Sequence, residues 1–490
     1  MTKPIVLCIL DGVGISPKTE HNAVKLAKMP FLNGLFAGYP HSQLEASGPA
    51  VGLPENTMGN SEVGHIAIGS GRIVNQFLRR FQIEDWNKNV ALENFIKQVT
   101  DTDGIVHLIG MMSDRGVHSD INNTIAIARR VLDAGLKVCV HFISDGRDTI
   151  PQIAERYIEQ LRTTFEPEFI SGQMWFGTLV GRYYAMDRNQ NLDRTELAHE
   201  AIANAHATFN APSIDVALEN AYGRGETDEF IKPVVIQPTP ITDKDGILFC
   251  NHRSDRARQI LRMLLKTGAH MLCFSQYGEG LDELCPALLN DIPVANTLGD
   301  VLVKNGKSQL RIAETEKYNH VTYYFDAERT IDYDGEEKVL IASPDVATFD
   351  LKPEVSALEI TDALLSRLDK FDVIILNYAN GDLIGHTGYE DKAIQSLEFL
   401  DAQLARFVPR VLELGGTVLV TADHGNIEDL WDDEAGAPNK AHTTNPVPFI
   451  VVSNDEHTVS NGGLGDIAPT ILHLLNIAQP SEMTGHNLVK

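Results

Sequence analysis

The chain has 490 residues, 43% hydrophobic and 22% charged, which is ordinary for a globular protein and too long for a single core. Its 41 Lys and Arg against 67 Asp and Glu give a formal net charge of -26, which argues against broad binding to nucleic acid or anionic membranes. We therefore expect two or three domains, and an anionic small substrate would need a local cluster of basic residues.

Four short apolar runs near the two ends of the chain predict buried strands: 5–10, 371–376, 416–421 and 448–452. They are rich in β-branched residues and lack polar alternation, which is typical of strands buried on both faces of a parallel sheet. Helical patterns lie between them, at 357–368 and 393–414. This predicts an α/β fold that binds ligands at the carboxyl ends of its strands, where Asp11, Asp382 and Asp423 fall.

The middle of the chain repeats the α/β rhythm, with strands expected at 105–109, 137–143 and 175–179 and helices at 122–134 and 154–164. Plausible crossing points lie near Gln76 and near 293–298. We therefore expect a discontinuous first domain, 1–76 and 299–490, interrupted by an inserted second α/β domain, 77–298.

Two features bear on the compartment. The five cysteines are scattered without a Cys-x-x-Cys pair, which favours free thiols in a reducing cytoplasm. The run 5–10 is too short for a signal peptide, and no apolar segment approaches the length of a membrane-spanning helix. We expect a cytoplasmic protein that binds neither membranes nor nucleic acid.

Seven residues from the two ends of the chain have the chemistry of a two-metal phosphoryl-transfer site: Asp11, Ser61, Asp382, His386, Asp423, His424 and His442. Asp and His together suit divalent ions such as Mn, Zn or Co. The spacing of Asp382 and His386 puts both on one face if the segment is helical. Gly425 and Asn426 suggest a loop, which would let Asp423 and His424 converge. Two close metal ions can stabilise both the attacking and the leaving oxygen of a phosphoryl transfer.

The sequence predicts a helix that starts at Ser61, where the helix dipole and a bound metal would favour its alkoxide and then a phosphoserine. Each residue also has a simpler interpretation. Serine at a helix start is usually a cap, an Asp after a strand is often a turn residue, and His442 could bind backbone. Their joint occurrence favours the metal site.

Basic residues concentrate in motifs of the middle segment and just after it: Asp145-Gly146-Arg147-Asp148, Gly181-Arg182-Tyr183-Tyr184 through Arg188, Arg253-Ser254-Asp255-Arg256 and Ala313-Glu314-Thr315-Glu316-Lys317-Tyr318. Arginine contacts phosphate and carboxylate with two parallel hydrogen bonds. Surface ion pairs are the alternative for each single arginine. Asp148 is either a structural partner of Arg147 or a general base, and His118 alone is more typical of a structural histidine.

These motifs, with Asn60-Ser61-Glu62-Val63-Gly64-His65, Asn377-Tyr378-Ala379-Asn380 and Thr421-Ala422-Asp423-His424-Gly425-Asn426, resemble those of the cofactor-independent phosphoglycerate mutases, in the alkaline phosphatase superfamily. The resemblance runs essentially from end to end. It implies an alkaline-phosphatase-like core with a mainly parallel sheet and an inserted α/β domain. It also implies a cytoplasmic monomer that interconverts 3-phosphoglycerate and 2-phosphoglycerate in glycolysis and gluconeogenesis, without 2,3-bisphosphoglycerate.

Carried over by position, the resemblance implies two divalent ions, with manganese expected and magnesium, zinc or cobalt also open. Asp382, His386 and His442 would hold one, and Asp11, Ser61, Asp423 and His424 the other. Ser61 would be the phosphorylated nucleophile, and Asp148 the candidate for handling the glycerate hydroxyl proton. The substrate would meet eight residues: His118, Arg147, Asp148, Arg182, Arg188, Arg253, Arg256 and Lys317.

The sequence departs from the family pattern at a few positions. Arg115 and Asp120 stand where Gly and His are frequent, His252 replaces an aromatic residue, and Phe325-Asp326-Ala327-Glu328 replaces Phe-Asn-Gly-Gly. None removes a proposed ligand. A metal-dependent phosphatase or phosphopentomutase would share the seven residues but not the Asp-Gly-Arg-Asp and Glu-Thr-Glu-Lys-Tyr motifs. A silent metal-binding scaffold would have no need of Ser61.

Overall fold

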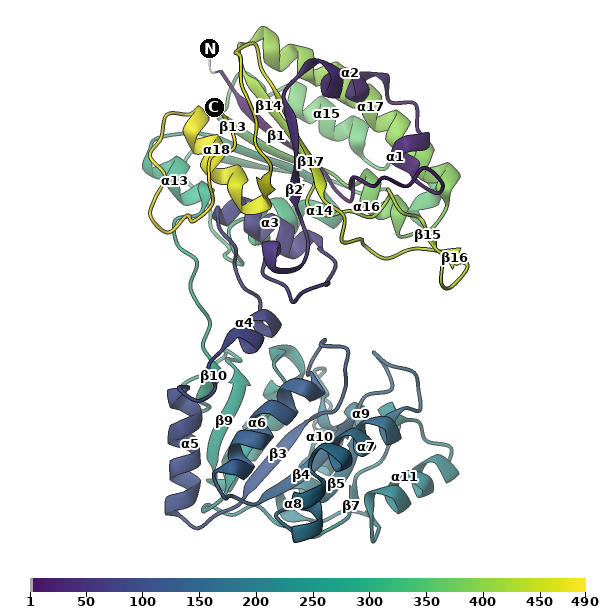
Figure 1. The fold of residues 1–490 in the computed structure, drawn as a ribbon, viewed down its shortest axis with the longest axis vertical. Helices are drawn as coiled ribbons and strands as arrows, with labels where there is room; N and C mark the ends of the chain where they lie inside the picture. The colour runs from purple at the N-terminus through teal and green to yellow at the C-terminus, as the bar shows by residue number, and fades with distance from the viewer. Residues whose placement is uncertain (1–2) are drawn as a thin grey trace. The chain divides into compact units, whose positions relative to one another are not determined.

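The computed structural model describes residues 3–490, which form two compact units, each with its own sheet and hydrophobic core (Figure 1). Unit 1 contains the chain up to Arg79 together with Pro293–Lys490, and unit 2 is Arg80–Ile292. The sequence of unit 2 is therefore inserted into that of unit 1, and each unit is described separately.

Unit 1 is built on a sheet that has eight strands among residues 3–490, in the order β12-β11-β13-β1-β14-β17-β2-β18. Their bounds are β12 Glu336–Ile341, β11 Gln309–Glu314, β13 Val373–Tyr378, β1 Ile5–Leu10, β14 Thr417–Thr421, β17 Val447–Val452, β2 His41–Glu45 and β18 Gly462–Gly463. The strands from β12 to β14 run parallel, whereas β17 is antiparallel to both β14 and β2. The expectation that the run at 448–452 also joins the sheet in parallel is therefore wrong, although the sheet is mainly parallel.

The centre of this sheet is buried on both faces, which explains its uninterrupted apolar runs: every residue of β1 and β13 is buried. Helices α1, α2, α15 and α17 pack together on one face, and α3, α13 and α18 on the other (Figure 1). Their bounds are Ala23–Leu26, Pro30–Gly38, Ala357–Leu365 and Glu390–Glu413 for the first group, and Ser61–Ser70, Leu298–Lys304 and Ile467–Leu474 for the second.

Unit 2 has a second sheet, whose order over the described residues is β10-β9-β8-β3-β4-β5-β7-β6. Its strands are β10 Ala287–Leu289, β9 His270–Ser275, β8 Gly246–Phe249, β3 Val106–Met111, β4 Val138–Ser144, β5 Met174–Gly181, β7 Val234–Val235 and β6 Phe209–Asn210. The six from β10 to β5 run parallel, and β7 is antiparallel to β5. The helices are α5 Val90–Asp101, α6 Ile121–Asp133, α7 Ala154–Thr164, α8 Glu166–Ser171, α9 Arg182–Ala185, α10 Leu192–Asn204, α11 Ile214–Gly223 and α12 Arg258–Leu264.

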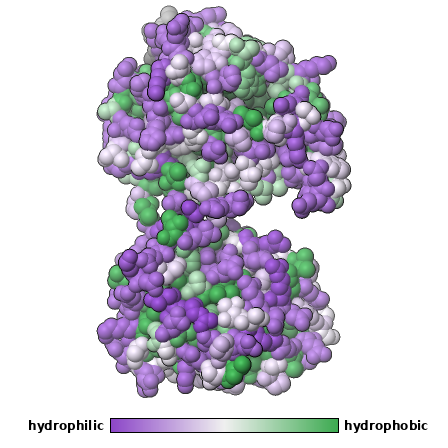
Figure 2. Space-filling model, viewed as in Figure 1, coloured by the Kyte–Doolittle hydropathy of each residue, from purple (hydrophilic) through white to green (hydrophobic). Residues whose placement is uncertain are grey.

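The strands and helices expected from apolar periodicity are confirmed, with ends that shift by a few residues. The five cysteines are free and buried. Within residues 3–490 no helix is both long enough and apolar enough to cross a membrane. The faces of the two units seen in Figure 2 are mostly hydrophilic, with apolar side chains scattered among polar ones.

Candidate metal centre and arginine cluster

Four neighbouring parallel strands of unit 1 end at one edge of the sheet, and each is followed by a candidate site residue. Asp11 follows β1 and Asp423 follows β14, while Lys317 lies in α14 (Thr315–Asn319) after β11. Asp382 lies in α16 (Asn380–Gly385), which follows β13. The side chains converge because carboxyl ends of parallel strands share one edge.

His442 reaches the same edge because β17 runs the other way, so the loop before β17 lies beside the loop after β14. The N–H of Thr443 donates to the carbonyl of Gly425 at 3.0 Å and joins these two loops. Nδ1 of His442 lies 2.8 Å from the carbonyl oxygen of Gly59, which leaves Nε2 facing Asp382. The backbone contact considered for His442 is thus made by one ring nitrogen while the other faces the site.

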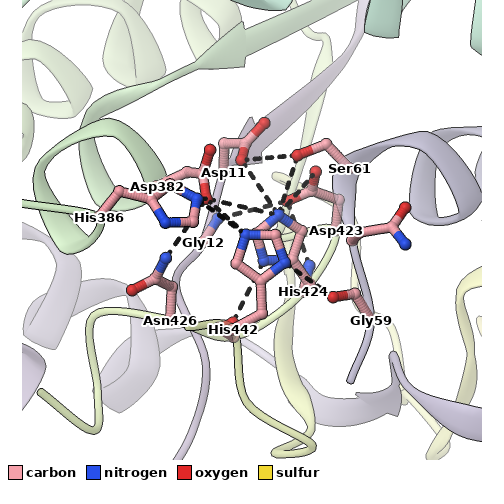
Figure 3. Close-up of polar contacts among 12 residues, drawn as sticks. Asp11, Gly12, Gly59, Ser61, Asp382, His386, Asp423, His424, Asn426 and His442 are labelled. Carbon is pink, nitrogen blue, oxygen red and sulfur yellow. Dashed lines mark hydrogen bonds and ion pairs between the residues drawn. The ribbon is translucent and has the colours of Figure 1, made fainter. Parts of the chain in front are cut away.

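Asp382, His386 and His442 form a first group of candidate ligands (Figure 3). Oδ1 of Asp382 lies 3.0 Å from Nε2 of both histidines, and the two Nε2 atoms are 3.1 Å apart. Ligand atoms bound at about 2.1 Å to one divalent ion lie about 3 Å from one another. The triangle therefore has the dimensions of one face of a coordination shell.

Asp11, Ser61, Asp423 and His424 form the second group beside it (Figure 3). Oγ of Ser61 lies 2.9 Å from Nε2 of His424 and 3.3 Å from Oδ1 of Asp11. Nε2 of His424 is also 3.4 Å from Oδ1 of Asp11 and 3.7 Å from Oδ2 of Asp423. The structure therefore brings together all seven residues singled out in the sequence.

Ser61 is the first residue of helix α3, but it is not the cap. The side chain of Asn60 accepts the hydrogen bond from the N–H of Val63 at 3.1 Å, so the capping role belongs to Asn60. The Ser61 hydroxyl is thereby left to face Asp11 and His424, and it is buried. An anion at this hydroxyl would lie at the positive end of the helix.

The ammonium group of Lys317 lies among the ligands of both groups. Nζ is 2.8 Å from Oδ1 of Asp11, 2.8 Å from Oγ of Ser61 and 2.6 Å from Oδ2 of Asp382. Burial opposes the charged form, but the neighbouring carboxylates of Asp11, Asp382 and Asp423 raise the pKa of Lys317 well above its ordinary value. The ammonium group of Lys317 is thus a buried cation among three buried carboxylates.

The donor set fits divalent cations. Three carboxylates, three imidazoles and one hydroxyl suit borderline metals. Oδ2 of Asp423 is buried and accepts no hydrogen bond from the described part of the chain, with Nδ1 of His65 3.3 Å away. Burial lowers the pKa of His424, but Asp423, Asp11 and Asp382 together raise it to about 9. This environment favours positive charge strongly.

Two residues behind the ligands were not singled out by the sequence analysis. Nδ2 of Asn377 donates to Oδ2 of Asp11 at 2.7 Å and lies 3.2 Å from Nε2 of His65. Nδ1 of His65 lies 2.8 Å from the carbonyl oxygen of Ser61. Both residues stand inside the quoted motifs, and the position of His65 one helical turn after Ser61 is the signal that could have identified it.

Unit 2 has its own convergence of charged residues at the carboxyl ends of β3, β4, β5 and β8. His118 follows β3, Arg147 follows β4, Arg182 begins α9 after β5, and Arg253 and Arg256 follow β8. Burial and then the positive charges of Arg188, Arg182 and Arg147 lower the pKa of Arg256, because those three charges act on its guanidinium group. The seven unit 2 residues expected to meet substrate thus belong to one edge of one sheet.

Aspartate side chains form ion pairs with the arginines of this cluster and hold them in place. Arg188 and Arg253 approach Asp255 at 2.7 and 3.1 Å. Nη1 of Arg182 donates to Oδ2 of Asp148 at 2.6 Å and to Oδ1 of Asp145 at the same distance.

One partner differs from the expected one. The ion pair of Arg147 is with Glu229, at 3.5 Å, so the structural partner of Asp148 is Arg182 rather than its neighbour in sequence. Burial and the charge of Arg182 lower the pKa of His118 to about 4, so His118 is neutral at pH 7.

A third cluster, His107, Cys139 and His141, is buried in the sheet of unit 2. Nδ1 of His107 lies 2.9 Å from Nε2 of His141, and the two rings are only 18° from parallel. Nδ1 of His141 lies 3.0 Å from the hydroxyl of Thr178. These short contacts are those of a buried hydrogen-bond chain, which accounts for the cluster without a metal ion.

Comparison with known proteins identifies the family of this chain. The model of the Metalloenzyme superfamily matches residues 3–479, so the chain belongs to that superfamily. The chain is 42% identical to the 2,3-bisphosphoglycerate-independent phosphoglycerate mutase of Ectopseudomonas mendocina, over 100% of this chain and 99% of that protein. It is 43% identical to 2,3-bisphosphoglycerate-independent phosphoglycerate mutase 1 of Methanosarcina acetivorans, over 99% and 98%. The protein belongs to the family of the 2,3-bisphosphoglycerate-independent phosphoglycerate mutases.

A solved structure of Leishmania mexicana phosphoglycerate mutase, at low cobalt concentration, is similar over the whole chain. Its TM-score is 0.67 at 26% identity, and the match covers 100% of this chain and 98% of that one. The family resemblance and the α/β fold class expected from the sequence are confirmed.

Proposed function

We propose that this protein interconverts 3-phosphoglycerate and 2-phosphoglycerate through a phosphoserine at Ser61, with two divalent cations, preferably manganese. One observation carries the proposal: the Ser61 hydroxyl lies within 3.3 Å of Asp11, His424 and Lys317, at the start of a helix. A hydroxyl held among metal ligands and a cation is suited to attack phosphorus and to be released from it again.

The residues of unit 1 divide into two ligand sets in this proposal. Asp382, His386 and His442 hold one cation, and Asp11, Ser61, Asp423 and His424 hold the other. When bound, these cations supply positive charge that eases ionisation of the Ser61 hydroxyl and stabilises the transferring phosphoryl oxygens. The ammonium group of Lys317 can donate hydrogen bonds to the same phosphoryl oxygens. The positive end of α3 stabilises the negative charge of a phosphoserine at Ser61.

The arginine cluster of unit 2 supports a mutase rather than a phosphatase. Arg147, Arg182, Arg188, Arg253 and Arg256 bring five guanidinium groups to one edge of the sheet, and guanidinium groups bind carboxylates as well as phosphates. Such a cluster can retain glycerate after Ser61 has taken its phosphoryl group. Asp148, whose Oδ2 accepts a hydrogen bond from Arg182 at 2.6 Å, is the general base that we assign to remove the proton from the glycerate hydroxyl.

The wider assignments follow from this function. The metal-binding domain is the discontinuous one, the inserted domain binds glycerate, and we place the protein in the cytoplasm as a monomer that acts on a small molecule. The buried free cysteines support a reducing compartment.

The decisive assay follows conversion of 3-phosphoglycerate without 2,3-bisphosphoglycerate, in protein stripped by chelator and then supplied with Mn, Mg, Zn or Co. We expect the chelator to abolish turnover and Mn to restore it best. Turnover that survives exhaustive chelation would contradict the metal mechanism. Release of free phosphate at the rate of mutase turnover would show a phosphatase instead.

The phosphoserine has its own test. Ser61→Ala should fold, bind Mn and lose mutase turnover by several orders of magnitude, because no other hydroxyl can take its place in the ligand group. Rapid quenching of the wild-type protein with labelled substrate should leave label on Ser61, identified by peptide mass spectrometry. Substantial turnover by the alanine variant would exclude this route.

A further inference from the structure

Glu428 is a fully buried carboxylate that neither ligand group uses. Its Oε2 accepts hydrogen bonds from the backbone N–H of Gly14 at 3.0 Å and of Asn426 at 2.8 Å. Its Oε1 accepts from Nδ2 of Asn445 at 2.9 Å and from the hydroxyl of Thr443. Four donors on one carboxylate compensate the cost of burying its charge and fix both of its oxygens.

These four donors come from the three loops that supply most of the metal ligands. Gly14 lies three residues after Asp11, in the loop that follows β1. Asn426 lies two residues after His424, in the loop that follows β14, and Thr443 is the neighbour of His442. The loops are distant in sequence, so a single side chain links segments more than 400 residues apart.

The carboxylate is also confined sterically. A Cβ on Gly14 would lie 2.4 Å from Cδ of Glu428, and a Cβ on Gly425 would lie 2.3 Å from its Oε1. The two glycines therefore let both loops close directly onto the carboxylate. With contacts on every side, the position of Glu428 and the positions of the three loops depend on one another.

We infer that Glu428 is a positioning residue that sets the spacing of the two cation sites by hydrogen-bonding the three loops that carry Asp11, Asp423, His424 and His442. The inference rests on the proposed two-metal site and extends it. Glu428 touches neither the reacting atoms nor a cation. It acts through the ligands, as outer groups do around other protein metal sites, where their loss typically weakens binding 10- to 100-fold.

Two substitutions of Glu428 separate the effect of its side-chain length from the effect of its charge. Glu428→Asp keeps the charge but is one methylene shorter, so it cannot contact all three loops. Glu428→Gln keeps the reach and removes the charge. The side-chain oxygen of the glutamine in this variant can accept the hydrogen bonds from the N–H groups of Gly14 and Asn426. Its NH₂ group can donate to the hydroxyl oxygen of Thr443, once that hydroxyl has rotated, and to the amide oxygen of Asn445, once that amide has flipped.

Asp401→Asn is the matched control. Asp401 is a buried carboxylate of unit 1 that accepts from the backbone N–H of Phe31 and Leu32 at the start of α2, at 3.1 and 2.7 Å. The elements it joins, α17 and α2, carry none of the candidate ligands. Its substitution should lower thermal stability and leave Mn affinity unchanged.

The measurement is a calorimetric titration of metal-stripped, folded protein with Mn, followed by kcat and KM at saturating Mn. We expect Glu428→Asp to weaken Mn binding tenfold or more and to lower kcat with little change in KM. Glu428→Gln should stay within about threefold of the wild type. Wild-type Mn affinity in Glu428→Asp, or a loss in Glu428→Gln as large as that in Glu428→Asp, would overturn the inference.

Binding is measured without turnover, so the two proposals fail differently. A wild-type protein that binds Mn but has no mutase activity would contradict the proposed function, and the variants would still decide the role of Glu428. Normal mutase activity together with unchanged Mn affinity in Glu428→Asp would contradict this inference alone.

Discussion

Lys317 contributes positive charge to the candidate metal centre in the metal-free protein, because its ammonium contacts Asp11, Ser61 and Asp382. Lys317→Met keeps the side-chain volume but leaves buried carboxylates without their cation, which costs about 3–5 kcal/mol. We expect a lower Tm in EDTA and a larger rise in Tm on adding Mn than in the wild type. An equal rise in both proteins would contradict this role.

Lys307→Met is the control for that experiment. Lys307 pairs with Asp372 at 3.3 Å near the surface of the same unit, where solvent screens the interaction. Its loss should change stability by about 1 kcal/mol or less and should not alter the response to Mn.

Glu314 predicts a pH dependence of stability. Burial raises the pKa of Glu314 to about 7, although Ser343 and Ser356 donate hydrogen bonds to it. Because the folded pKa lies above the unfolded one, the stability from this group is complete below about pH 4.5 and is lost as pH rises through 7. Glu314→Gln should therefore gain stability relative to the wild type, by up to about 3 kcal/mol between pH 4.5 and 7. Urea unfolding from pH 5 to 8 measures this difference, and a difference independent of pH would contradict it.

Some residues of the candidate site could be predicted from the sequence and others could not. Asp11, Asp382 and Asp423 were singled out as candidate ligands because acidic residues just after apolar strands are informative by type and position. Asn377 and Glu428 were not found, because an amide and a carboxylate become informative only through partners in remote loops. Asp148 was paired with Arg147 by adjacency, whereas the fold places Arg182 against it.

At the scale of elements, helix α3 approaches the Asp423 loop through Gly64. A Cβ at Gly64 would lie 2.6 Å from the carbonyl oxygen of Asp423, so Gly64→Ala must shift the first turn of α3 and with it Ser61. A displacement of about 1 Å costs roughly 100-fold in rate, and we expect at least that loss in kcat. Steady-state kinetics and circular dichroism should show an inactive but folded protein.

Gly34→Ala provides the comparison for Gly64→Ala. Gly34 lies inside α2, and a Cβ there would meet no atom within 4 Å. Alanine should stabilise this helix by up to about 1 kcal/mol and leave kcat unchanged. If both variants retained wild-type kcat, close packing at Gly64 would not be what positions Ser61.

The direction of a strand within its sheet could not be predicted from the sequence. The run at 448–452 has the apolar composition of its parallel neighbours, and composition alone carries no direction. The reversal of β17 is what places His442 at the metal edge of the sheet. His442 was therefore singled out for its joint occurrence with the other candidate ligands and not from strand order.

At the scale of the whole molecule, unit 2 has the parts of an independent domain: its own sheet and a hydrophobic cluster that includes Ile109, Phe249 and Leu261. We predict that a chain of residues 80–292 alone folds and unfolds cooperatively. Thermal melting by circular dichroism and dispersion of amide NMR signals would test this. A broad, non-cooperative melt would show that unit 2 needs unit 1 in order to fold.

The place of β1 in its sheet has a consequence for synthesis of the protein. β1 leaves the ribosome long before its two neighbours, β13 and β14, which lie more than 360 residues later in the chain. At about 5–20 residues per second, translation of that interval takes roughly 20–70 s. During this time an apolar strand with two unpaired edges is exposed while unit 2 is completed. We therefore expect general chaperones to bind the nascent β1 segment, because the central strand of the sheet is made early and is paired late.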